Sequence, residues 1–123
     1  MFLRVLQMMV LMLAISLAQQ AEAGGGRAAW KKLDRALAYL KALPEVAWVK
    51  YEGRDVLIGW KGFPGNFGPI NKTAAQKAAR ALRHEVTVYS LRAEQTTFKP
   101  GGEQPHLCQT IANPTEIVHS NCR

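Results

Sequence analysis

The sequence predicts an α+β fold in which a small antiparallel sheet of three or four strands packs against two helices. Residues 46–61 combine β-branched and aromatic side chains on both sides of a short polar turn, which is typical of a β-hairpin. Residues 27–43 and 73–84 instead repeat apolar side chains at helical spacing. The expected order is therefore helix, strand, strand, helix, strand, followed by a C-terminal segment that a disulfide holds in place.

The first predicted helix covers residues 27–43 and ends before Pro44, because the residue preceding a proline is disfavoured in the α region. Its apolar residues recur at spacings of three, four and three, with charged residues on the other side. This stripe consists of Trp30, Leu33, Leu37 and Leu40. We therefore interpret Trp30 as a core anchor rather than a ligand-binding residue.

The hairpin turns at residues 52–55, where Gly53 can adopt a positive φ angle. Alternation along each strand leaves apolar side chains on nearly both faces. The face that does not meet the helices is therefore expected to be at least partly covered.

Residues 62–70 contain three glycines and two prolines, which predicts an irregular loop. The second helix is expected to begin at Thr73, because Thr73 and Gln76 match a capping box, with Asn71 as an alternative cap. Its buried stripe is mostly alanine, so it can approach the sheet closely. Asn71 also begins an N-glycosylation pattern, which is short and common.

Residues 86–91 form the next predicted strand, and residues 92–106 are polar enough to predict an exposed connection. Residues 107–112 are a candidate fourth strand. Beyond it, Asn113 and Pro114 suit either the start of a short helix or the turn of a second hairpin.

The predicted order is that of a ferredoxin-like fold without its first strand. In that arrangement residues 107–112 would fill the gap between the hairpin and the strand at 86–91. In the alternative arrangement, the strand at 86–91 pairs directly and in parallel with residues 56–61, through a right-handed crossover. Neither topology implies a function.

The N-terminus predicts export. Arg4 precedes an apolar run at residues 5–18, and Ala21 and Ala23 supply the small residues of a cleavage site. The run is shorter than the roughly 20 residues that span a bilayer, which makes an uncleaved anchor the weaker alternative. We expect a signal peptide at 1–23, an α+β domain at 24–106 and a disulfide-closed segment at 107–123. The expected location is secreted or periplasmic.

The chain is basic, with a net charge of +7 that removal of residues 1–23 does not change. Such a charge favours an anionic partner: nucleic acid, an anionic membrane surface or an acidic polymer of the cell envelope. A protein partner is also compatible with the sequence. A role in solubility alone is the stronger interpretation, because no Lys/Arg run exceeds two residues. The clearest cluster of cations lies on the outer side of the second helix. It consists of Lys72, Lys77, Arg80 and Arg83.

Cys108 and Cys122 are the only cysteines, and in an exported chain they most simply form one disulfide. With His106 and His119 they could instead supply four zinc ligands, but the usual Cys-x-x-Cys spacing is absent. A Cys–His hydrolase would need one thiol free. The sequence contains no serine-hydrolase elbow and no phosphate-binding glycine loop, so we assign neither catalytic residues nor a cofactor.

Aromatic and cationic side chains gather at the end of the hairpin and in the following loop. Trp60, Lys61, Phe63 and Phe67 lie within eight residues. They could stack on bases, sugars or side chains of a partner, or the two phenylalanines could fold back and close the core. We therefore expect an exported binding or accessory protein that acts without catalysis. A small secreted hydrolase or effector, or a basic binder of anionic polymer or nucleic acid, is the alternative.

Overall fold

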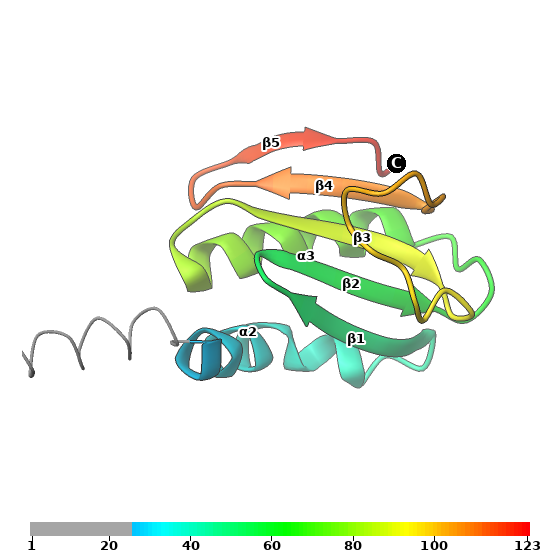
Figure 1. The fold of residues 1–123 in the computed structure, drawn as a ribbon, viewed down its shortest axis with the longest axis horizontal. Coiled ribbons are helices and arrows are strands. Elements are labelled where there is room, and N and C mark those ends of the chain that lie inside the picture. The colour runs from blue at the N-terminus through cyan, green and yellow to red at the C-terminus, as the bar shows by residue number, and fades with distance from the viewer. Residues whose placement is uncertain (1–25) are drawn as a thin grey trace, which may run out of the picture. The chain divides into compact units, whose positions relative to one another are not determined.

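The computed structural model describes residues 26–123, and the predicted signal peptide lies outside them. Two helices and five strands follow one another along the chain (Figure 1). They are α2 (Gly26–Lys41), β1 (Val46–Glu52), β2 (Asp55–Trp60), α3 (Phe67–Leu82), β3 (Val86–Arg92), β4 (Cys108–Ala112) and β5 (Ile117–Ser120). Residues 32–123 form one compact unit, to which the sheet and its layers belong. Within the described residues, neither helix is long and apolar enough to cross a membrane.

All five strands form one mixed sheet in the order β1-β2-β3-β4-β5. β2 and β3 are parallel and connected through α3, whereas the other neighbouring pairs are antiparallel. The α+β class is thus confirmed, but the expected three or four antiparallel strands are wrong. The ferredoxin-like arrangement is also wrong, because residues 107–112 do not separate β2 from β3. They pair with the far edge of β3, which leaves β3 free to pair directly with β2.

The main core lies between the sheet and the two helices. α2 contributes Leu33, Leu37 and Leu40, and the sheet contributes Val56 and Ile58 among others. α3 faces them with alanines, whose small side chains let the helix backbone approach the sheet. These alanines are Ala74, Ala75, Ala78 and Ala79. The predicted stripe of α2 is therefore confirmed from Leu33 onward, but Trp30 is 53% exposed and is not a core anchor.

The other face of the sheet is covered in part by residues 93–107, which cross it in Figure 1. Phe98 from this segment is buried against Leu57 and Leu91, with Trp48 and Tyr89 around them. The prediction that the second face is partly covered is therefore confirmed. The expectation of an exposed connection holds for most of its residues, but Phe98 is buried against the apolar surface that β2 and β3 present on this side.

α3 begins at Phe67, earlier than the predicted start at Thr73. Gly68 and Pro69 fit its first turn because the first N–H groups of a helix have no partner within the helix. The predicted capping box does not form, since Thr73 lies inside the helix. The Gln76 side-chain amide instead donates to the carbonyl of Asn113, at 2.8 Å.

The C-terminal segment is a second hairpin. The Asn113 side-chain oxygen accepts hydrogen bonds from the backbone N–H groups of Thr115 and Glu116, at 2.9 and 2.8 Å. This turn connects β4 to β5, so of the two alternatives the hairpin is correct and the short helix is wrong. The predicted disulfide between Cys108 and Cys122 is confirmed, and it joins the first residue of β4 to the second residue after β5.

Candidate binding site at the carboxyl ends of two parallel strands

Trp60, the first member of the predicted aromatic surface, belongs to the core. Its side chain is fully buried, and its indole N–H donates to the hydroxyl of Ser90 at 3.0 Å. Its ring centroid lies 6.4 Å from that of Phe67, which packs on the main core from the first turn of α3. Of the two loop phenylalanines predicted either to close the core or to form a binding surface, Phe67 therefore closes the core, beside Trp60.

Phe63 behaves differently, since 62% of its surface is exposed. The guanidinium carbon of Arg92 lies 4.7 Å from the centroid of its ring, which is a cation–π contact. Arg92 ends β3 and is the register partner of Trp60, which ends β2. The parallel pairing therefore brings the loop after β2 and the last residue of β3 to the same end of the sheet, where both strands finish. In open sheets with parallel strands, the carboxyl ends of the strands are a frequent place for ligands.

A pocket of about 360 Å³ opens beside Arg92. Its walls are Arg92, Gln95, Pro105, His106 and Leu107, so both ends of the segment that covers the second face contribute to it. A second pocket of about 250 Å³ adjoins it and shares Gln95 and Pro105. The larger volume lies within the range of small-molecule sites.

Gln95 fixes the shape of the larger pocket. Its side-chain oxygen accepts a hydrogen bond from the backbone N–H of Arg92 at 2.9 Å. Its amide nitrogen donates to the carbonyl of Pro105 at 2.6 Å. One side chain thus ties together the two ends of the covering segment, and both of its polar atoms are engaged in doing so.

His106 forms another wall and is held by aromatic rings. Its ring packs edge-on against Tyr89, with centroids 5.4 Å apart, and against Phe98, with centroids 6.3 Å apart. The imidazole is half-buried and therefore has a defined orientation at the pocket rather than a free one.

Two cations, Lys61 and Arg92, lie at the carboxyl ends of β2 and β3, and neither forms an ion pair with a described acidic residue. The ion pairs within residues 26–123 join Lys41 to Asp34 and Lys99 to Glu52. Within the same residues, the guanidinium N–H groups of Arg92 make no hydrogen bond. Lys61 is also exposed, one residue beyond Trp60. Lys61 and Arg92 therefore take part in neither of these ion pairs.

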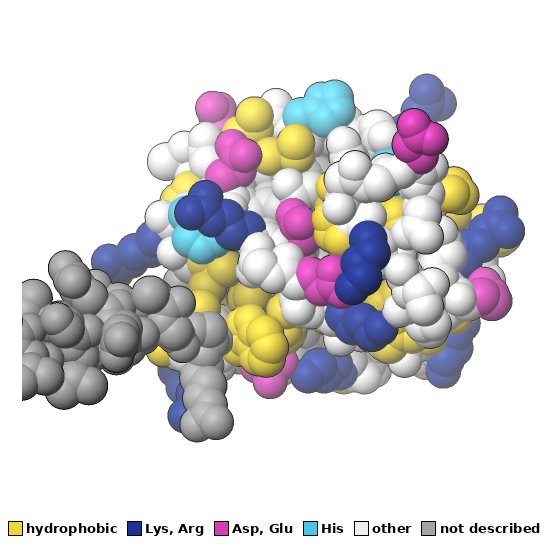
Figure 2. Space-filling view, viewed as in Figure 1, with side chains coloured by type: hydrophobic (Ala, Val, Ile, Leu, Met, Phe, Trp, Pro, Cys, Tyr) yellow, Lys and Arg dark blue, Asp and Glu magenta, His cyan; other side chains and the backbone are white. Residues whose placement is uncertain are grey.

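The predicted basic face of the second helix is less coherent than its sequence suggests. The Lys77 ammonium lies 4.9 Å from the ring centroid of Tyr39 on α2, whereas Arg80 Nε donates to the carbonyl of Pro114 at 3.4 Å. Lys72 is half-buried, and Arg83 lies beyond the last turn in a left-handed conformation. Figure 2 shows the opposite side of the sheet, on which Lys and Arg side chains are scattered among Asp and Glu.

The zinc alternative is wrong because both of its sulfur ligands are consumed by the disulfide. Its histidines also serve elsewhere, His106 at the pocket and His119 on β5, where it is exposed. In the part of the chain that the structure describes, no three His, Cys, Asp or Glu side chains are placed to hold a metal ion.

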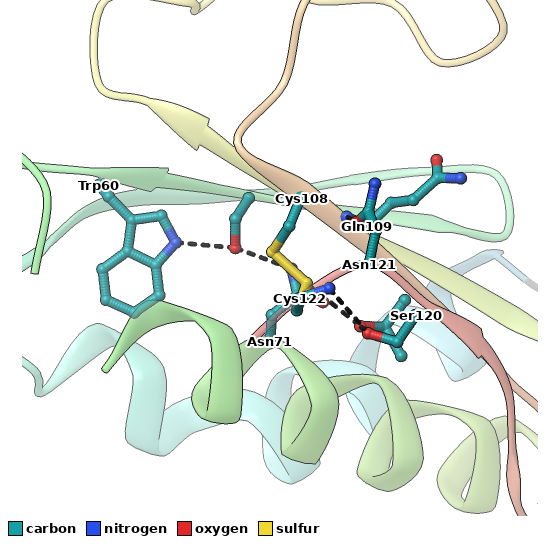
Figure 3. The surroundings of a disulfide bond; sticks show 9 residues. Trp60, Asn71, Cys108, Gln109, Ser120, Asn121 and Cys122 are labelled. Atoms are coloured by element: carbon teal, nitrogen blue, oxygen red, sulfur yellow. Dashed lines mark hydrogen bonds between the residues drawn. A yellow bond between two sulfur atoms is a disulfide. The ribbon is translucent and has the colours of Figure 1, made fainter. Parts of the chain in front are cut away.

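A buried polar chain lies beside the disulfide (Figure 3). The hydroxyl of Ser90 accepts from the indole N–H of Trp60 and from the side-chain amide of Asn71, at 3.0 and 2.7 Å. Asn71 is fully buried, so the folded protein does not present the N-glycosylation pattern that begins with it. Trp60 is thus part of the core and is not exposed to a ligand.

Sequence reasoning found Phe63 and Lys61 but missed Arg92, Gln95 and the wall at 105–107. Arg92 follows a predicted strand and could be suspected only if the parallel topology were known. No sequence signal marks Gln95, whose role depends on the path of the covering segment.

Comparisons with known protein families, curated proteins and solved structures gave no match for this chain.

Proposed function

We propose that this chain is an exported small binding or accessory protein of the cell envelope or secreted space, acting without catalysis. Its binding surface is formed by Phe63, Arg92 and the larger pocket. The observation that carries the proposal is the exposed ring of Phe63 under a guanidinium that has no acidic partner among the described residues.

A single exposed apolar side chain needs no explanation, but this combination does. The contact between the ring and the guanidinium places an apolar and a positively charged group side by side, and Arg92 also lines the pocket. Aromatic and arginine side chains in such settings supply much of the binding energy of interfaces, because they bury large areas and keep directional hydrogen bonds. Bases, sugars and aromatic side chains of a partner are all suited to stack on it.

The disulfide supports the export part of the proposal, since disulfides persist mainly in oxidising compartments. The test is N-terminal sequencing of the protein from producing cells, with Gly24 expected as the first residue. Finding Met1 on most molecules would refute cleavage.

The binding part is tested with neutral probes that represent the three candidate partners: indole, a disaccharide and uridine. Each is titrated into the ¹⁵N-labelled mature protein while amide shifts are followed. We expect at least one probe to shift residues 61–66 and Arg92, and Phe63→Ala to abolish the effect. Val118→Ala is the matched control, because Val118 is a comparably exposed apolar residue on β5. Shifts that persist in Phe63→Ala, or their absence with all three probes, would refute the proposed surface.

A further inference from the structure

We infer that the pocket beside Phe63 takes a ligand with a single carboxylate attached to an apolar group. This inference rests on the proposed function, since it concerns the same site and adds the chemical class of its ligand.

The carboxylate is assigned from the state of Arg92. Its guanidinium touches the ring of Phe63, which offers no oxygen acceptor. Among residues 26–123 no carboxylate or carbonyl oxygen accepts from its side-chain N–H groups, although its backbone N–H is bonded to Gln95. A guanidinium presents paired donors in a plane, which match the two oxygens of a carboxylate. Arg92 is exposed and lines the pocket, and its side-chain donors are available to a ligand.

The single charge follows from the other walls. Gln95 uses both of its side-chain polar atoms within the protein, and Pro105 and Leu107 are apolar. None of the five lining residues is acidic, and Arg92 is the only one with a permanent positive charge. A doubly charged phosphate is usually held by several cations or by backbone N–H groups, whereas one guanidinium balances one carboxylate.

The apolar group of the ligand is assigned from the surfaces next to Arg92. Phe63 provides an exposed ring in contact with Arg92, and Leu107 and Pro105 provide aliphatic surface among the pocket walls. The carboxylate can belong to a small apolar acid or to the C-terminus of a peptide that ends in an apolar residue. Both ligands present one carboxylate next to an apolar group.

The test compares ligands that differ only in charge. Phenylacetate and phenylacetamide form one pair, and a tripeptide ending in phenylalanine, with its C-terminus free or amidated, forms the other. Each is titrated into the ¹⁵N-labelled mature protein at constant ionic strength. We expect the charged member of at least one pair to bind about tenfold tighter or more, with shifts at Arg92, Gln95 and His106. Whichever charged member binds tighter identifies the source.

Two substitutions test whether Arg92 binds the carboxylate of the ligand. Arg92→Gln is expected to reduce the affinity for the charged member to that of its neutral analogue. Arg92→Lys keeps the charge but loses the paired donors, so an intermediate affinity is expected. Arg54→Gln in the turn between β1 and β2 removes an equal charge from an exposed position that lines neither pocket, and it should change nothing.

The outcomes separate this inference from the proposed function. If charged and neutral members shift the Phe63 loop equally, or if Arg54→Gln weakens binding as much as Arg92→Gln, the carboxylate assignment is overturned while the binding surface stands. If no probe, charged or neutral, shifts Phe63 or the pocket, both are overturned. Arg92→Lys keeps the test decisive should Arg92→Gln fail to fold.

Discussion

The indole ring of Trp48 on β1 lies against Gly59 on β2, in the place that a Cβ atom would occupy on any other residue. From there its N–H donates to the carbonyl of Ala93 at 2.8 Å. The Lys50 ammonium lies 5.3 Å from the ring centroid and donates to the carbonyl of Thr96 at 2.7 Å. The missing side chain of Gly59 thus allows Trp48 to attach the segment that forms the pocket walls to the hairpin.

We expect Gly59→Ala to lower the free energy of unfolding by about 1–3 kcal/mol, because the added methyl group must displace the Trp48 ring. Urea unfolding measures this. Gly65→Ala is the control, since a Cβ atom there meets open space. If the two variants unfold at the same urea concentration, the Trp48 ring does not depend on Gly59.

The two loop phenylalanines should respond differently to alanine. Phe67→Ala is expected to cost about 3 kcal/mol, at the low end for a large core side chain because Phe67 is only half-buried. Phe63→Ala should change stability by less than about 0.5 kcal/mol, as substitutions of exposed side chains usually do. Thermal and urea unfolding measure the loss of stability in each variant. Equal losses in both variants would mean that Phe63 is also part of the core.

The sequence predicts the elements of this fold better than their arrangement. The hairpin, most of α2 and the disulfide follow from local patterns: alternation, helical spacing and a pair of cysteines. The pairing of β2 with β3 joins strands that are far apart in the sequence, and local patterns do not show which strands pair. The start of α3 was predicted too late because Gly68 and Pro69 usually interrupt helices, whereas in a first turn they interrupt nothing.

The candidate site was predicted in part for the same reason. Phe63 and Lys61 were found because they are neighbours in sequence. Arg92 joins them only through the parallel register of β2 and β3. Phe98 and Gln95 were missed because their segment is polar in composition, and a single buried ring is enough to fix its path.

Reduction of the Cys108–Cys122 disulfide should lower the free energy of unfolding by about 3 kcal/mol, as expected for a closed loop with a sequence separation of 14. The disulfide joins β4 to the residues after β5, at the end of the strand order opposite β1, so hydrogen exchange should accelerate first in β5 and last in the β1–β2 hairpin. The measurement is hydrogen exchange with and without a reductant. Simultaneous loss of protection in β1 and β5 would instead show that the hairpins unfold as one unit.

Substitution of two aspartates by asparagine should change the pH dependence of the free energy of unfolding in opposite directions. Burial, and then the charge of Glu52, raise the pKa of Asp55. The folded state therefore binds the Asp55 proton more tightly than the unfolded state, and the stability this gives is lost as pH rises through the folded pKa. Asparagine does not titrate, so the Asp55→Asn variant does not lose this stability as pH rises. Compared with the parent protein, the variant should therefore be more stable at neutral pH than it is at acid pH.

Asp34 is the matched case of opposite sign. Hydrogen bonds from Lys41, and then from Tyr51, hold the pKa of Asp34 below its usual value. The stability that this carboxylate provides is present above the unfolded pKa and lost as pH falls through the folded pKa. Asp34→Asn should therefore be relatively less stable at neutral pH than at acid pH. Urea unfolding between about pH 3 and pH 7 measures both variants, and equal pH profiles would contradict the assignment.

The polar chain beneath the disulfide gives the last prediction. Ser90→Ala leaves two buried donors, the Trp60 indole N–H and the Asn71 amide, without their acceptor. A buried donor that loses its partner costs about 1–3 kcal/mol, so we expect a loss of at least about 2 kcal/mol in the free energy of unfolding. Trp60→Phe removes one of these donors, and its combination with Ser90→Ala should cost less than the two single changes together. Strict additivity in urea unfolding would mean that Trp60 and Ser90 do not stabilise one another.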